Sequence, residues 1–426
     1  MNARIVALAV LLLAVAAPAR AGELWESEDG DWAWEGGGFL KAQGMGMGFR
    51  GIKLYKGLTG ADRAGMQTTK LRLGTDLYWR DLRIGAQYEA RMTVLSKGMD
   101  FGATMPGFGS TQSDRPRLWS IPDVDSDGLL LQNDLDRYYF KAAIGPMDLT
   151  VGRQAISWGS AWFWKPTDRW SPFSPMDIDP DVKRGVDAAR AELYLGPRTS
   201  LDLITSFERH EDTDREWWVH GGARLRTGFA HWDLAVSLAR FQLSKDGNWM
   251  AGLEFTGELG KVGVRGEVAA NVDEDLEDWD IQGVVGADYH FPFKLTCAGE
   301  FFYNGYGTDD TSDYTSFYFD PVDPTVSPLK SERLLRGEAF NIGRYYLGLS
   351  LSQELHPLVH LSLSSITNLL DPSGMLIAGL QWSVVQDAKI KAGAMIPIGK
   401  KPSGFNIETE YGAMPIAGYV VMKLSF

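Results

Sequence analysis

Apolar and polar side chains alternate with a period of two along most of the chain. Between residues 71 and 80, one face carries three leucines, Thr75 and Trp79, and the other carries arginines, Gly74, Asp76 and Tyr78. Residues 83–94 continue this alternation, and it returns at 186–195, 199–207, 262–270, 281–290, 345–354, 376–385 and 388–396. A period of two is the period of a β-strand. These segments run about nine to twelve residues, the length of a tilted strand that crosses a bilayer.

Short and long connections alternate between the candidate strands, of which about 18 can be counted from Gly37. The short turns are Asp81-Leu82, Gly145-Pro146, Gly196-Pro197, 228–230, Gly260-Lys261, 291–293, His356-Pro357 and Gln386-Asp387. The longer, polar connections are 50–68, 97–128, 158–185, 208–216, 271–280, 304–343, 368–374 and 399–416. The pattern predicts an all-β fold, a transmembrane antiparallel up-and-down β-barrel with short periplasmic turns and long extracellular loops.

The N-terminus has the features of an export signal. Arg4 precedes an apolar run over 5–17, and Ala19-Arg20-Ala21 is the small-x-small pattern that signal peptidase cleaves after. We therefore expect a cleaved signal peptide over 1–21, an acidic, tryptophan-rich periplasmic segment over 22–36, and the barrel over 37–426. The expected location is the outer membrane of a Gram-negative bacterium, where lipid and lipopolysaccharide surround the barrel.

The C-terminus ends on an alternating strand whose last residue is aromatic. Val420, Met422, Leu424 and Phe426 share one face. Such an ending resembles the signal that the barrel assembly machinery of the outer membrane reads, so Phe426 is the candidate assembly signal.

Composition excludes several other classes. One cysteine allows neither a disulfide framework nor a cysteine-based metal site, and a net charge of −13 argues against nucleic-acid binding. Six histidines lie beside no nucleophile motif, so we expect no enzyme, no cofactor and no metal site. The outward loops are acidic, and the choice between solvated loops and divalent-cation binding stays open.

The polar face of the barrel carries the expected function, because about 18 strands leave an aqueous lumen unless loops fill it. The candidate pore-lining residues are the cations on that face: Arg72, Arg91, Arg137, Lys141, Arg153, Arg190, Arg224, Arg226 and Arg265. A turn at Asp81-Leu82 would place Arg72 directly opposite Arg91, an unfavourable pairing that a passing anion would relieve. The lumen also contains many acids, so a wall of ion pairs that selects nothing is the alternative.

The segment 152–190 is the most distinctive. It contains Gly152-Arg153-Gln154, Trp158-Gly159, Pro166-Thr-Asp168 and the return Gly185-Val-Asp-Ala-Ala-Arg190. Trp158, Trp162, Trp164, Asp168 and Trp170 are candidates for a loop that constricts the barrel, and Asp168 is a candidate cap of a short helix. Strict alternation places Arg153 on the lipid face, so we expect a β-bulge that returns it to the lumen.

These motifs resemble those of porin-like outer-membrane barrels, including the alginate-export-type 18-stranded barrels. The resemblance covers about 40 residues, and it implies an arginine-lined pore for an anionic polysaccharide, with Arg153 and Arg190 as possible solute-facing residues. The acids in this lumen depart from that pattern.

The sequence therefore predicts a porin-like channel through which small or anionic solutes diffuse, including sugar acids or polysaccharide. The alternative is a structural or adhesion-type barrel with a plugged lumen. The sequence does not fix the oligomeric state.

Overall fold

The computed structural model describes residues 22–53, 60–96, 118, 121, 123–126, 128–178, 182–209, 217–242, 247–273, 278–315, 340–404 and 406–426. Within them lie twenty strands and two short 3-10 helices. The strands are β1 (Gly22–Glu26), β2 (Trp32–Gly48), β3 (Arg63–Trp79), β4 (Leu82–Leu95), β5 (Val124–Ser126), β6 (Leu129–Ile144), β7 (Met147–Gln154), β8 (Val186–Gly196), β9 (Thr199–Arg209), β10 (Trp217–Phe229), β11 (Trp232–Gln242), β12 (Gly247–Leu259), β13 (Val262–Asp273), β14 (Asp278–His290), β15 (Leu295–Asn304), β16 (Tyr345–His356), β17 (Val359–Asn368), β18 (Ser373–Val385), β19 (Ala388–Ile398) and β20 (Ile416–Ser425). The 3-10 helices are η1 (Thr311–Asp313) and η2 (Tyr411–Ala413).

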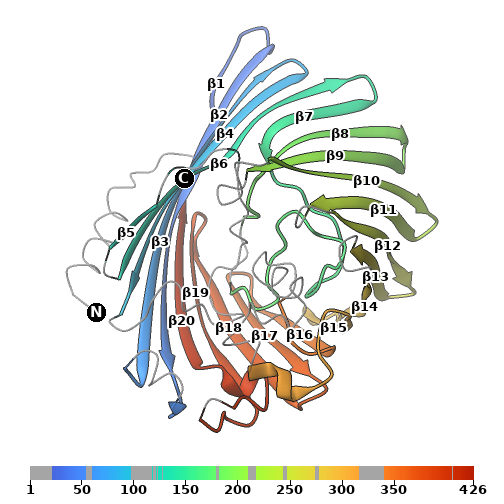
Figure 1. The fold of residues 1–426 in the computed structure, drawn as a ribbon. Coiled ribbons are helices and arrows are strands. Elements are labelled where there is room, and N and C mark those ends of the chain that lie inside the picture. The colour runs from blue at the N-terminus through green and yellow to red at the C-terminus, as the bar shows by residue number, and fades with distance from the viewer. Residues whose placement is uncertain are drawn as a thin grey trace.

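The strands close into one antiparallel barrel (Figure 1). Each strand pairs with its neighbours in sequence, and β20 returns to pair with β2 from Phe39↔Ser425 to Gly48↔Ile416. The short strands β1 and β5 lie outside this ring, so the twenty strands of the sheet less these two leave 18 in the barrel. The predicted 18-stranded barrel is confirmed.

The two faces of the wall differ in polarity, as the alternation predicted. Large apolar side chains such as Leu73, Val236, Leu253 and Val420 are exposed on the outside. Their sequence neighbours point inward, where charged and amide side chains such as Glu254 are buried. Closing the sheet gives each of the 18 barrel strands two partners, so the ring has no free edge along these strands.

The first hairpin of the wall departs from the predicted register. Trp79 pairs with Leu82, so the turn is Arg80-Asp81 and not Asp81-Leu82. Arg80 adopts a φ of 50°, which a two-residue hairpin turn of this kind requires. A turn one residue earlier changes every cross-strand partner in the hairpin by two positions.

The N-terminal segment is part of the same sheet. β1 pairs antiparallel with the start of β2, from Gly22↔Gly36 to Glu26↔Ala33. β2 runs without interruption from Trp32 to Gly48, five residues earlier than the predicted barrel start at Gly37. The predicted signal peptide over 1–21 lies outside the described residues. Among the described helices, none has the length and apolar character needed to cross a bilayer.

The last residue closes the seam between the first and last barrel strands. The Gly38 N–H donates to the Phe426 carbonyl oxygen at 2.6 Å, and the Phe426 N–H donates to the Gly38 carbonyl oxygen at 3.0 Å. The Phe426 ring lies over Gly38, where a side chain would come within 3.0 Å of the ring and would also meet the Arg72 carbonyl.

Deletion of Phe426 removes both seam hydrogen bonds and the ring contact with Gly38, each bond being worth about 1 kcal/mol. We expect poor assembly and periplasmic degradation, measured as loss of the heat-modifiable band in gels, whereas Phe426→Tyr assembles normally. A normal heat-modifiable barrel in the deletion variant would show that Phe426 has no assembly role.

Candidate functional site: the lumen and its constriction loop

The segment between β7 and β8 folds into the barrel instead of away from it. Figure 1 shows this green segment inside the ring of strands. Trp158, Trp164 and Trp170 are buried there, whereas the Trp162 side chain remains 47% exposed. We refer to the described residues 155–178 and 182–185 as the constriction loop.

Two carboxylates from the opposite wall hold the backbone of this loop. Glu267 on β13 accepts hydrogen bonds from the Ser160 and Ala161 N–H groups at 2.5 and 2.7 Å. Glu300 on β15 accepts from the Trp162 and Phe163 N–H groups at 2.5 and 2.8 Å. Both glutamates are buried, and hydrogen bonds to a charged acceptor are the stronger kind. These two acids, which counted against an anionic solute in the sequence, therefore position the loop, and we call the pair the glutamate clamp.

The tryptophans fix the loop along its length. The indole N–H groups of Trp158, Trp164 and Trp170 donate to Asp202, Asn341 and Ser206 at 3.1, 2.8 and 3.1 Å. Trp158 and Trp170 pack edge to face, with ring centroids 4.4 Å apart.

Gly222 on β10 leaves room for these two rings. A Cβ atom at this position would lie 2.7 Å from the Trp170 ring and 2.9 Å from the Trp158 ring. The wall is therefore shaped to receive the loop.

Asp168 has a role other than the predicted helix cap. No helix follows it: its N–H donates to the Lys165 carbonyl in a turn, and its carboxylate ion-pairs with the buried Lys183. The next residue, Arg169, donates to Asn271 and Tyr306 at 2.8 and 2.9 Å. Sequence reasoning missed Arg169, because nothing in its local pattern shows which strands the loop reaches.

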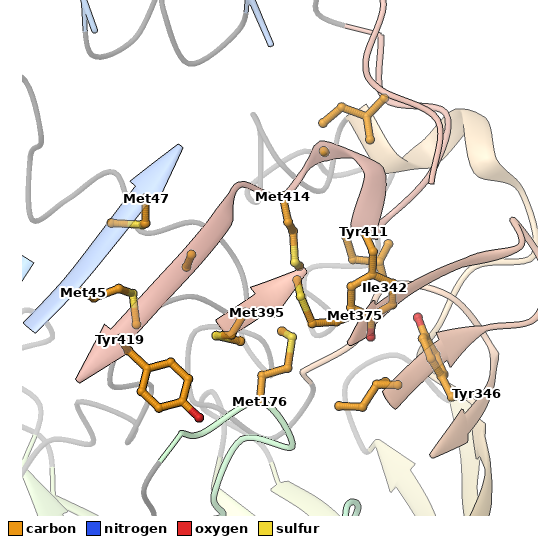
Figure 2. Packing of buried hydrophobic residues seen from close by; sticks show 14 of the residues in the cluster. Met45, Met47, Met176, Ile342, Tyr346, Met375, Met395, Tyr411, Met414 and Tyr419 are labelled. Carbon is orange, nitrogen blue, oxygen red and sulfur yellow. The ribbon is translucent and has the colours of Figure 1, made fainter. Parts of the chain in front are cut away.

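An apolar core fills the lumen between the constriction loop, β2 and β18–β20 (Figure 2). We call it the methionine core, because it contains six buried methionines, which are Met45, Met47, Met176, Met375, Met395 and Met414. Sequence reasoning missed this core as well. Its signal is the run Gly44-Met45-Gly46-Met47, in which large side chains face inward and glycines face outward. This core occupies part of the lumen.

The predicted pairing of Arg72 with Arg91 is wrong. The register places Arg72 opposite Glu89, and Arg91 opposite Lys70. Arg72 is buried and ion-pairs with Glu89 at 3.1 Å and Asp136 at 2.7 Å. Arg91 also pairs with Glu89, at 2.8 Å. The one-residue displacement of the turn explains this difference.

Most other predicted pore-lining cations have carboxylate partners. Arg137 pairs with Asp136 at 2.6 Å, Lys141 with Asp148 at 2.6 Å, Arg190 with Asp202 at 2.7 Å, Arg224 with Glu254 at 2.6 Å, and Arg265 with Asp288. Arg265 also lies over the Trp162 ring, 5.1 Å from its centroid. Arg226 is exposed and lies opposite Ala235. This part of the wall matches the ion-pair alternative.

Arg153 is fully buried and is held by Asp187 at 2.9 Å and Asp134 at 3.3 Å. The expected bulge is not in its strand, because the pairing of β7 with β6 and β8 shows no shift. The irregularity lies in the neighbouring pair of β4 and β6, at Asp136. By register Arg153 shares a face with Asp187, opposite the face of Arg190. Its side chain therefore stabilises the wall and does not line an open passage.

Five cations form a row across five adjacent strands, and we call it the basic row. Lys389, Lys423, Lys41, Lys70 and Arg91 occupy directly paired positions on β19, β20, β2, β3 and β4. Strands in barrels tilt by roughly 35–45°, so a row perpendicular to them climbs roughly 10–15 Å through the lumen. The row begins beside the turn at 386–387 and rises toward the opposite end of the barrel.

The constriction loop faces this row. Asp177 of the loop interacts electrostatically with Lys41 and Lys70 of the row, and the Lys391 ammonium, beside the row on β19, donates to the Ile178 carbonyl. Burial raises the pKa of the Asp177 carboxyl to about 6, while Lys41 and Lys70 favour its charged form. Sequence reasoning missed Lys41, Lys70 and Lys423, because the row exists only once β20 closes against β2.

A buried polar network joins loops around Glu410. Its carboxylate accepts from the Tyr346 hydroxyl at 2.6 Å, the Asn368 amide at 2.9 Å and the Ile342 N–H at 3.2 Å. Burial raises the pKa of Glu410 to about 7, and the nearby Asp371 charge adds to this effect.

The acidic loops show structural roles where the structure describes them. Asp309 pairs with Arg344 at 2.8 Å, Asp310 caps η1, and Asp313 accepts from Thr308. Within the described parts of the chain, His, Cys, Asp and Glu form no cluster of three or more that could hold a metal ion.

Comparisons with known proteins support the fold. No protein-family model matches the chain, and no curated protein matches its sequence. Among solved structures, Acinetobacter baumannii OccAB4 matches with a TM-score of 0.55 at 9% identity, over 92% of this chain and 98% of that one. Pseudomonas aeruginosa OccK11 (OpdR) matches with 0.55 at 10% identity, over 96% and 98%. A BenF-like porin from Pseudomonas fluorescens matches with 0.54 at 10% identity, over 92% and 98%. The alginate-export subtype finds no support among these three, and it stays a hypothesis.

We predict that Glu267→Gln and Glu300→Gln loosen the constriction loop. Each substitution weakens hydrogen bonds to a charged acceptor, which are worth about 1.5–3 kcal/mol each. We expect a larger and noisier single-channel current, with Glu258→Gln, an exposed glutamate on β12, as the control. A current that equals the wild type in both variants would show that these carboxylates do not hold the loop.

We also predict that the loop around Glu410 depends on pH. Because folding raises the pKa of this carboxyl from 4.5 to about 7, its contribution to stability is complete below about pH 4.5 and is lost as the pH rises through 7. The change is at most ~3 kcal/mol. Amide exchange at 399–415 should be slower at pH 5 than at pH 8 after correction for intrinsic exchange, and Glu410→Gln should remove the difference. Equal corrected rates in the wild type would contradict this prediction.

Proposed function

We propose that this protein is an outer-membrane channel for small anionic solutes. In a closed barrel, the backbone N–H and C=O groups of every barrel strand are hydrogen-bonded to neighbouring strands, and here the outside is apolar and the inside polar. Both features suit a bilayer and support the proposed location. One of the similar solved structures is itself named a BenF-like porin, which is consistent with a channel.

The basic row is the single observation that carries the choice of an anion. Like charges on directly paired positions repel, so placing five cations in one row costs Coulomb energy. A passing anion recovers part of that energy at each step, and the oblique course of the row leads it along the lumen. Within the row, Lys70 and Arg91 share the carboxylate of Glu89, whereas the paired arginines outside the row each lie within ion-pair distance of an Asp or Glu.

Passage of a polysaccharide is a weaker hypothesis. The constriction loop and the methionine core occupy much of the lumen, and Arg153, one of the two residues carried over from the alginate-export resemblance, is fully buried. Arg190 is paired with Asp202. These contacts favour small solutes over a bulky chain.

A barrel with a plugged lumen is the second candidate, and the methionine core favours it. The purified protein in a planar bilayer should show discrete single-channel steps in 1 M KCl. If the wild type shows no steps but the Glu267→Gln, Glu300→Gln double variant conducts, the wild-type lumen is plugged by the constriction loop.

We predict anion preference in the wild type, measured as the reversal potential in a KCl gradient. The Lys41→Gln, Lys70→Gln variant should lower the chloride-to-potassium permeability ratio by roughly two- to fivefold, because one close charge is worth ~1 kcal/mol in water. The control variant Arg226→Gln, Lys261→Gln also removes two positive charges, but outside the row, and should change the permeability ratio less. Cation preference in the wild type would overturn the proposed function.

A further inference from the structure

The N-terminal hairpin carries a cluster of exposed tryptophans. Trp25 pairs with Trp34 across β1 and β2, and Trp32 stacks on Trp79 of β3 with centroids 5.3 Å apart and an interplanar angle of 16°. These four side chains are between 37% and 51% exposed. We refer to them as the tryptophan face.

The register places this face on the outside of the barrel. Trp34 pairs with Leu77, which alternates along β3 with the inward Arg72 and Asp76. The other face of the hairpin is acidic, since Glu23 pairs with Glu35, and Glu35 with Asp76. The hairpin is therefore amphipathic, with indoles outward and carboxylates on the side of the lumen.

Hydrogen bonds and an ion pair hold the turn of the hairpin. Ser27 N–H donates to the Trp32 carbonyl at 2.9 Å, and Arg80 ion-pairs with Asp31 at 2.6 Å. The Ser27 hydroxyl donates to Asp29 at 2.5 Å and holds the pKa of that carboxyl below its usual value. These contacts fix the turn that presents the tryptophan face.

The tryptophan face is continuous with the apolar outside of the wall. Leu73 on β3 and Ile84 on β4 are 43% and 54% exposed on the same side, and Ile144 beside the next short turn is 54% exposed. If the outside of the barrel contacts lipid, the same surface reaches the short turns. Tryptophan concentrates where a membrane meets water, because the ring is apolar and the indole N–H is polar.

We propose that residues 22–34 form an interfacial anchor whose tryptophan face binds the headgroup region of the periplasmic leaflet. The inference rests on the proposed outer-membrane location. β1 and β20 pair with successive parts of the same edge of β2, β1 with its start and β20 with the residues that follow. The anchor therefore sets the depth of the seam where the barrel closes. The acidic face points away from lipid, toward the aqueous opening of the lumen.

Single-cysteine variants with a polarity-sensitive fluorophore test this anchor. Cys297→Ser removes the native thiol, and labels are then placed at Trp25→Cys, at Glu28→Cys in the turn, and at Val236→Cys on the outward face of β11. The proteins are reconstituted in phosphatidylethanolamine and phosphatidylglycerol vesicles, with spin-labelled headgroups as quenchers. We expect the label at 25 to be blue-shifted and quenched at least threefold more than the label at 28.

The label at Val236 separates the two proposals. If it is in water, the proposed membrane location fails. If it is in lipid while the label at 25 matches the label at 28, the anchor is overturned and the location stands; the tryptophan face then fits a protein partner. Trp79→Cys provides a second labelling position on the face, so the test survives misfolding of the Trp25 variant.

Discussion

An apolar outer surface forces the charged side chains of this barrel into its lumen, where each must find a partner. Buried charges are stable only when they are paired or hydrogen-bonded. The buried glutamates of the wall illustrate two kinds of partner, which are arginines of nearby strands and backbone N–H groups of the constriction loop. Glu254 takes the first kind, with Arg224, while Glu267 and Glu300 take the second. The position of the loop therefore follows from the need of buried carboxylates on the wall for hydrogen-bond donors.

This arrangement divides the lumen into parts with different roles. The methionine core fills the side of β2 and β18–β20, and the glutamate clamp fixes the loop against β13 and β15. The basic row lies near Asp177 of the loop, which interacts electrostatically with Lys41 and Lys70. In the proposed channel, a passage along the row would have one cationic wall and one wall formed by the loop, which Glu267 and Glu300 hold in place.

The sequence predicted the strand alternation, the closed 18-stranded barrel, and the tryptophan-rich loop at 152–190. The prediction from the sequence was wrong where a displacement of a turn by one residue changes the cross-strand pairing. A turn at Arg80-Asp81 instead of Asp81-Leu82 replaces the expected Arg72–Arg91 pair by Arg72–Glu89. It failed also where closure creates neighbours, because Lys41 and Lys423 are almost 400 residues apart in the chain but directly paired. Strand periodicity is local, whereas register across the seam depends on the whole barrel.

The central claim is that the basic row, in which Lys70 and Arg91 share Glu89, attracts anions more strongly than the ion-paired arginines outside the row. Anomalous diffraction from crystals soaked in bromide tests it directly, because it locates the ions. We expect bromide sites along Lys389, Lys423, Lys41, Lys70 and Arg91. Bromide beside Arg137 and Arg224 with none along this row, or rubidium ions in its place after a parallel soak, would contradict the claim.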